Sequence, residues 1–266
     1  MKKTGIVLLF VFTCNIVLAQ TEHISFYKKS EVMISMRDGI KLHTIIFSPV
    51  DTKQPLPVMV GEGVLHECLL NEEVQEVLVI GRKPCGITHP KLKEIIHPDF
   101  YNLSPVSDKL VGYNACFFCL GVSSVGMKEP EYFQLTHTLT LHVAEILSFQ
   151  NPGMTFCYIS GAGTDSTEKG RLMWARVKGK TENDLAKLPF KKVYNFRPGI
   201  LEPTKGLKNT LSFYKYFRWL APVIRAVVPK QMSTLKELGL AMINAVSKGY
   251  EKSIVEVSDI KLLAKK

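Results

Sequence analysis

The strongest constraint on the fold is an alternation that runs through the chain from Met59 onward. Short apolar runs, which suit buried strands, alternate with longer segments of helical periodicity. The expected strands are 76–80, 95–100, 115–120, 155–160 and 192–196, and the expected helices are 63–70, 131–148 and 170–186. Parallel strands need long crossover connections, usually helices. The pattern therefore predicts an α/β fold, a doubly wound parallel sheet with helices on both faces.

Composition agrees with a folded domain of this size. The chain has 266 residues, of which 46% are hydrophobic and 22% charged, enough to build a sizeable core. The net charge is +10, but the lysines are spread along the chain without an arginine-rich run. We interpret this charge as a solvated surface, and we expect no nucleic-acid partner.

The N-terminus has the features of an export signal. Lys2 and Lys3 precede an apolar run over 6–18, and small residues at 17–19 suit cleavage. The run is too short to cross a bilayer, and no later segment approaches the roughly 18 apolar residues that a spanning helix needs. We predict a signal peptide at 1–19, no stable membrane span, and export to the periplasm or the exterior.

The cysteines instead suggest a reduced, cytoplasmic-looking body. Five remain after the leader, an odd number, and most lie in apolar runs. Cys116 and Cys119 have CxxC spacing, but within one strand their side chains would point to opposite faces. Core filling is favoured over a redox role, and no metal site is expected. An exported leader on such a body indicates a chimeric chain.

Residues 20–57 are predicted to form a β-hairpin extension. Two alternating segments flank Asp38-Gly39, a strong hairpin signal. Together with the leader, MISMRDGIKLHTIIFSP resembles the start of secreted X-Pro dipeptidyl-peptidase/cocaine-esterase-type hydrolases. That resemblance implies the opening of an α/β-hydrolase fold. It stops near residue 58, and the order at 160–163 is not that of a nucleophile elbow, so the hydrolase chemistry is not carried over.

The body resembles another family. Seven segments carry the resemblance and occur in this order: VGEGVLHECL, VLVIGRKP, HPDFYNLSP, ACFFCLGVSSVG, FCYISGAGTDS, WARVKGKTENDL and VYNFRPGILEPTKG. Together they resemble atypical, epimerase-like short-chain dehydrogenases/reductases, an NAD(P)-binding group related to the Tat-interacting-protein-like enzymes. The resemblance implies a Rossmann domain over 58–266, with a small C-terminal substrate lobe over about 200–266. A small-molecule substrate is expected, and a homodimer is compatible with it.

The resemblance implies a phosphate-binding loop that is damaged in this chain. Gly61 matches the last of three family glycines, and Pro55 and Val58 occupy the places of the first two. Those glycines let the backbone approach a pyrophosphate closely. Gly61 and Gly63 serve either phosphate contact or helix packing. We expect residues 57–60 to fill the slot of the missing first strand.

Further residues are assigned to the cofactor. Arg82 and Lys83 end the second strand, where a basic pair would bind a ribose 2′-phosphate. They favour NADP(H) over NAD(H), although an exposed basic turn explains them almost as well. The resemblance puts Asp99 near the adenine, the alternative being a loop acid. It also places Gly121 against the cofactor.

The catalytic pattern of this superfamily is Ser/Thr followed by Tyr-x-x-x-Lys. Ser160 ends a core strand in the serine's place, and Lys178 stands in the lysine's place. The tyrosine position holds Trp174. An indole N–H can donate a hydrogen bond but cannot titrate as a useful acid. Asp165, Ser166 and Thr167 are weak substitutes, and a turn hydroxyl and a surface lysine are the plain alternatives for Ser160 and Lys178.

The segment Arg197-Pro198-Gly199 begins the part that turns over the nicotinamide in epimerase-like enzymes, and it is also a plain Pro-Gly turn. The sequence thus favours an NAD(P)(H)-binding, epimerase/dehydrogenase-like oxidoreductase, impaired by the lost glycines and tyrosine. A non-catalytic nucleotide-sensing or protein-interaction module is the alternative. An exported α/β-hydrolase fragment is the second alternative.

Overall fold

The computed structural model describes residues 27–35, 41–49, 58–81, 84–97, 99–119, 123–202, 204 and 231–265. The expected signal peptide lies outside these segments, as do Pro55, Arg82, Lys83 and Gly121. Within the described part, no helix combines the length and apolar character that crossing a bilayer requires.

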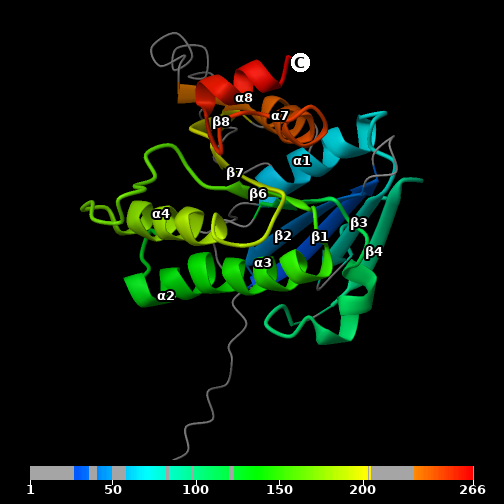
Figure 1. The fold of residues 1–266 in the computed structure, drawn as a ribbon, viewed down its shortest axis with the longest axis horizontal. Helices are drawn as coiled ribbons and strands as arrows, with labels where there is room; N and C mark the ends of the chain where they lie inside the picture. The colour runs from blue at the N-terminus through cyan, green and yellow to red at the C-terminus, as the bar shows by residue number, and fades with distance from the viewer. Residues whose placement is uncertain are drawn as a thin grey trace, which may run out of the picture.

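A six-stranded sheet forms the centre of the molecule, in the order β1-β2-β5-β6-β7-β10 (Figure 1). Its strands are β1 (Tyr27–Ser35), β2 (Lys41–Pro49), β5 (Ala115–Phe118), β6 (Thr155–Ile159), β7 (Lys192–Arg197) and β10 (Ile254–Glu256). Every neighbouring pair is parallel except β1 with β2. This is the Rossmann-type α/β architecture that the alternation predicts.

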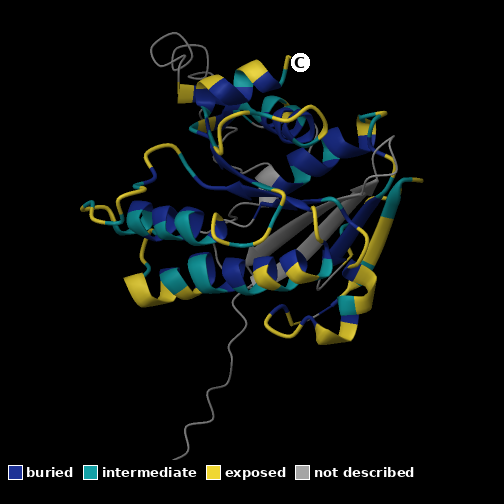
Figure 2. Cartoon of the chain, viewed as in Figure 1, coloured by how far each residue is buried: buried dark blue, intermediate teal, exposed yellow. Residues whose placement is uncertain are grey.

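Two smaller parallel pairs complete the strands. β3 (Val77–Gly81) pairs with β4 (Leu92–Ile96), and β3 lies beside β1. β8 (Ile200–Glu202) pairs with β9 (Met232–Thr234). The exposed strand β4 forms an outer edge (Figure 2). It begins and ends earlier than the predicted strand 95–100.

Helices cover both faces of the sheet (Figure 1). One face carries α1 (Val58–Leu70), α7 (Leu235–Ser247) and α8 (Val257–Leu263), and the other α2 (Glu129–Phe133), η2 (Gln134–Thr138), α3 (Leu139–Gln150) and α4 (Met173–Leu185). The π-helical turn η2 joins α2 to α3, and the short 3-10 helix η1 (Ser104–Leu110) precedes β5. Because strand side chains alternate, the core divides into two clusters, one on each face.

Cys116 and Cys119, the two cysteines with CxxC spacing, lie on opposite faces of the sheet. Cys116 belongs to one core cluster and Cys119 to the other, and both thiols are free and buried. Burial raises the pKa of the Cys119 thiol well above its usual value. The two cysteines fill the core from opposite sides, with Cys119 one residue beyond the end of β5. Among the described residues, no cluster of His, Cys, Asp or Glu is arranged to hold a metal ion.

The predicted strand over 57–60 is wrong. Residues 58–60 are the first residues of α1, which runs unbroken from Val58 to Leu70. The slot beside β5 is already occupied by β2, which pairs with it in parallel from Leu42↔Ala115 to Ile45↔Phe118. A vacant slot therefore does not exist. The apolar run at 58–60 extends the helical pattern that follows it.

The predicted N-terminal hairpin is present, with β1 and β2 paired from Tyr27↔Pro49 to Ser35↔Lys41. It is more than an extension, because its second strand belongs to the central sheet and precedes α1. Residues 41–49 thus supply the strand that pairs with β5 in the central sheet.

The C-terminal residues are also part of the main body. β10 extends the central sheet beside β7, and α7 packs on α1. The approach is close: a methyl group on Gly63 would lie 2.8 Å from Leu235 Cβ, and one on Gly239 would lie 2.9 Å from Glu67 Cβ. Residues 231–265, predicted within a separate lobe, therefore pack directly against the sheet and its helices.

Candidate functional site

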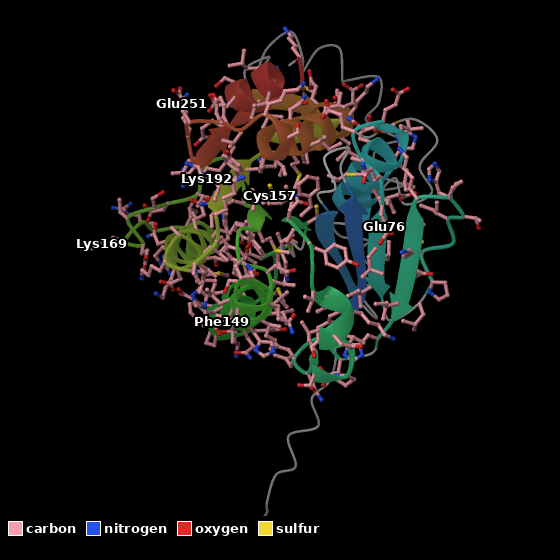
Figure 3. The ribbon with its side chains drawn as sticks, turned by 45° about the vertical axis from the view of Figure 1, so that its right-hand side comes forward. Glu76, Phe149, Cys157, Lys169, Lys192 and Glu251 are labelled. Carbon is pink, nitrogen blue, oxygen red and sulfur yellow. The ribbon has the colours of Figure 1, made fainter. Side chains whose placement is uncertain are left out.

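The carboxyl ends of β6 and β7 bring the main candidate residues together. Ligands of open α/β sheets bind at this edge. Ser160 directly follows β6, and its N–H donates to the Phe196 carbonyl of β7 at 2.7 Å. Helix α4, whose preceding loop projects outward at the labelled Lys169, supplies Trp174 and Lys178 (Figure 3).

Lys178 crosses from α4 to the end of β6. Its Nζ donates to the carbonyl oxygens of Ile159 at 3.2 Å and Ser160 at 3.3 Å, and lies 5.3 Å from the centre of the Tyr158 ring. The residue is 8% exposed. Burial lowers the pKa of Lys178 to about 8, which nearby Glu182 opposes in part. The surface-lysine alternative is therefore wrong.

Ser160 is buried and belongs to a small hydroxyl pair. Its Oγ lies 2.9 Å from Thr164 Oγ1, and Thr164 Oγ1 donates to the Gly161 carbonyl at 2.8 Å. Because the Thr164 hydroxyl proton goes to Gly161, Ser160 is the donor to Thr164 within this pair. Sequence reasoning missed Thr164, because a threonine in a Gly-rich turn carries no distinguishing signal.

Trp174 lies against the turn that follows β6. A methyl group on Gly161 or Gly163 would lie 3.7 or 3.6 Å from its indole ring. Gly163 has a φ of +88°, which favours glycine. The indole therefore covers the backbone next to Ser160, at the position where the resemblance expects a tyrosine. It provides a flat apolar surface and one N–H, but no titratable group.

The weak substitutes for the missing acid are engaged elsewhere. The Asp165 carboxylate accepts from Thr167 Oγ1 at 2.6 Å and from the Gly170 N–H at 2.6 Å. These hydrogen bonds lower the pKa of Asp165. Ser166 Oγ accepts from Arg197 Nη2 at 2.6 Å. Asp165 and Thr167 thus hold the loop before α4, while Ser166 holds an arginine.

Arg197 at the end of β7 forms a buried ion pair with Glu182 of α4. Its Nε donates to Glu182 Oε1 at 3.0 Å, and its Nη2 to Oε2 at 2.5 Å. Its Nη1 donates to Glu256 Oε1 at 3.3 Å. The Arg197 and Glu182 side chains are 10% and 2% exposed. The guanidinium therefore braces α4 against the sheet.

Pro198 and Gly199 continue from this brace toward the same edge. The Pro198 carbonyl accepts from the Ala162 N–H at 3.0 Å, which ties the two segments together. A methyl group on Gly199 would lie 2.1 Å from the Gln231 carbonyl oxygen, so this backbone approach requires glycine. The structure thus brings Arg197, Pro198 and Gly199 to the neighbourhood of Ser160 and Lys178.

The residues assigned to the other end of the cofactor are placed differently. Gly61 is buried in the first turn of α1, and Gly63 lies in the helix against Leu235. For Gly63 the packing alternative is therefore the one that the contacts support. Asp99 is exposed, and its Oδ1 accepts from the Tyr101 N–H at 2.9 Å, which is the local turn of a loop acid.

No protein-family model matches the chain. Its fold is similar to that of UDP-N-acetylglucosamine 4-epimerase from Bacillus cereus, with a TM-score of 0.51, 16% identity and 74% of each chain covered. UDP-glucose 4-epimerase from Thermotoga maritima gives a TM-score of 0.52 at 12% identity, covering 77% of this chain and 78% of that one.

A third similar structure is the dTDP-glucose 4,6-dehydratase DesIV from Streptomyces venezuelae, solved with NAD bound. Its TM-score is 0.53 at 11% identity, and 77% of each chain is covered. At such identities the likeness concerns the fold. The chain therefore has the Rossmann-type α/β fold found in these epimerases and this dehydratase.

Proposed function

We propose that the protein is an NAD(P)(H)-binding, epimerase- or dehydrogenase-like oxidoreductase whose usual tyrosine acid is absent. The observation that carries the proposal is Lys178, buried at the end of β6 with its ammonium on the Ile159 and Ser160 carbonyls. Burying an ammonium away from water and without a paired acid costs free energy, so this position calls for an explanation. This one lies at the sheet edge where α/β folds bind ligands.

The described residues fit the ribose end of a nicotinamide dinucleotide. An ammonium has three N–H donors, and Lys178 uses two on carbonyls, which leaves one for a ribose hydroxyl. Arg82 and Lys83, proposed to select NADP(H), lie outside the described residues. When bound, the cofactor would supply or accept hydride.

The chain's own groups would position a small substrate and its proton. The hydroxyl protons of Ser160 and Thr164 are used on Thr164 and Gly161, so Ser160 would accept from a substrate hydroxyl, or would donate to a substrate oxygen after rotating away from Thr164. Trp174 offers an indole face against the Gly161–Gly163 turn. The acid step lacks its usual residue, so we expect slow turnover or binding alone.

Calorimetric titration of the mature chain with NADPH and NADH tests the proposal. NADPH should bind more tightly than NADH, and Arg82→Asp should erase that preference, since an acid repels the 2′-phosphate. Lys178→Met should weaken both dinucleotides by about tenfold, the loss of one charge-assisted hydrogen bond. A chain that binds neither dinucleotide contradicts the proposal.

Trp174→Tyr tests the chemistry separately. It should raise the oxidation of NADPH by a reactive small diketone, because it restores a titratable donor four residues before Lys178. Lys178→Met in the Trp174→Tyr background should remove that gain. Bound NADPH with unchanged turnover would mean that the acid/base scheme of the family does not operate in this chain.

A non-catalytic nucleotide-sensing module is the second candidate. Two observations favour it: the untitratable Trp174 at the tyrosine position, and Gly63, which packs on Leu235. Dinucleotide binding without turnover, in the wild type and in W174Y alike, would support this candidate.

We further propose that residues 1–19 direct export. N-terminal sequencing of the secreted or periplasmic protein should find residue 20 first. An intact N-terminus on a protein retained in the cytoplasm would contradict this assignment.

A further inference from the structure

Lys178 has an acidic neighbour on its own helix. Glu182 follows one turn later on the buried face of α4, with its side chain 2% exposed. Residues at i and i+4 lie close enough on a helix to pair. Nevertheless, no ion pair joins Lys178 to Glu182, although the structure describes both side chains. The ammonium turns to the ends of β6 instead.

The reason is that Arg197 binds both carboxylate oxygens of Glu182. The two N–H···O distances are 3.0 and 2.5 Å, with donors on adjacent nitrogens of the same planar guanidinium. Ser166 Oγ and Glu256 Oε1 accept its remaining bonds and fix its orientation. Glu182 is therefore held on the β7 side of α4.

We propose that Arg197 is a positioning residue: by binding both oxygens of Glu182 it prevents a Glu182–Lys178 ion pair and leaves the third N–H of Lys178 for a ligand at the sheet edge. The proposal deepens the function proposed above and rests on it for the identity of the ligand. Its first half concerns only the protein's own side chains and holds or fails without a cofactor.

Electrostatics support this arrangement. An ammonium paired directly with a buried carboxylate keeps its proton more strongly, whereas one on neutral carbonyls in a buried site loses it more easily. The pKa of Lys178, lowered to about 8 chiefly by burial, has the sign expected for the unpaired arrangement. The charged groups around it are Glu182 on α4 and, through Glu182, Arg197 on β7.

The test is the titration of Lys178 by carbon-13 NMR in protein labelled with [ε-13C]lysine, the signal being assigned by its loss in K178R. Arg197→Lys keeps the positive charge but cannot bind both oxygens from a planar fork. It should free Glu182 to approach Lys178 and raise the pKa of Lys178 by about one unit, a tenfold tighter proton. R197K/E182Q should lose that rise.

Arg176→Lys is the matched control. Arg176 lies on the same helix and donates from Nη2 to Glu129 Oε2 at 2.7 Å, away from Lys178. R176K should leave the Lys178 titration unchanged. If R197K also leaves it unchanged, Arg197 does not control Glu182 and the proposal is overturned.

Even if R197K does not fold, the titration of the wild-type chain tests whether Lys178 is free of an ion pair with Glu182. An unpaired Lys178 should titrate well below the ordinary value of about 10.4, whereas a value above it would reveal a direct pair with Glu182 and refute the proposal. In a chain that binds NADPH, R197K should also weaken binding by several-fold. Failure of the wild type to bind either dinucleotide contradicts the proposed function, and the titration still tests Arg197.

Discussion

Helix α4 carries a lysine and an acid at i, i+4 spacing on each of two faces, and the two combinations differ in whether an ion pair forms and in the pKa of the lysine. On the outer face, Lys180 Nζ lies 2.9 Å from Asp184 Oδ2, and this hydrogen bond raises the pKa of Lys180. On the buried face, Lys178 and Glu182 do not pair, and burial lowers the pKa of Lys178. Helical spacing permits both pairs, so the surroundings decide which one forms.

Competition explains the difference. The Asp184 carboxylate accepts bonds from Lys180, Lys187 and His137, all at the surface or near it. The Glu182 carboxylate is saturated by Arg197, which lies fifteen residues away in sequence on β7. The buried Glu182 thus pairs with the planar guanidinium, whereas the partly solvated Asp184 divides its hydrogen bonds among two lysines and a histidine.

The largest expected effect comes from Glu182→Gln. It leaves Arg197 buried without its counter-charge, so the free energy of unfolding should fall by about 3–5 kcal/mol in urea denaturation. R197Q/E182Q should recover part of this loss, because neither charge remains. A loss under about 1 kcal/mol for E182Q would make the two faces of α4 energetically alike.

The second effect is a pH dependence from Lys178. Its folded pKa of about 8 lies below the ordinary 10.5, so between these values the unfolded chain binds more protons. The free energy of unfolding of wild type, minus that of K178M, should therefore rise by up to about 3 kcal/mol from pH 8 to pH 10.5. A flat difference would show that Lys178 keeps an ordinary pKa in the folded protein.

Asp184→Asn should cost less, about 1 kcal/mol at pH 7. Although burial opposes the effect, hydrogen bonds from Lys187, His137 and Lys180 hold the pKa of Asp184 well below its usual range. The stabilisation is present above the ordinary pKa and is lost as the pH falls below about 4. The wild type and D184N should therefore converge in acid unfolding, and parallel curves would contradict the assignment.

The smallest effect is expected for Lys180→Met. This pair is partly solvated, so its loss should cost about 0.3–0.5 kcal/mol and should shrink further in high salt. Urea denaturation at two salt concentrations measures both. A loss of stability as large as that of E182Q would contradict the view that the solvated pair contributes less than the buried one.

Local patterns predicted the strands whose side chains are buried on both faces. Residues 115–118 and 156–159 are continuous apolar runs, a pattern typical of central parallel strands. The i, i+4 spacing of Trp174 and Lys178 on one helix was likewise visible in the sequence. The burial of Lys178 was not predicted: the family resemblance gave the residue a role, and a surface lysine was the alternative.

Contacts between residues far apart in the sequence could not be predicted from local patterns. β2 alternates like any half-exposed hairpin strand, so nothing local shows that it pairs with β5 across more than sixty intervening residues. The Glu182–Arg197 pair joins a helix to a strand that follows it, and neither residue differs by type from the solvated charges nearby. Thr164 is similar, since its partner Ser160 became apparent only once the turn was folded.

The close packing of α1 on α7 bears on the order in which the chain can fold. The glycine face of α1 at Gly63 is covered by Leu235, and Gly239 of α7 fits against Glu67. During synthesis this early helix must wait for well over a hundred further residues before its cover exists. Contacts of such sequence separation slow folding, because a long loop must close before they form. The nascent chain therefore exposes an apolar helix face until the residues of α7 have been synthesised.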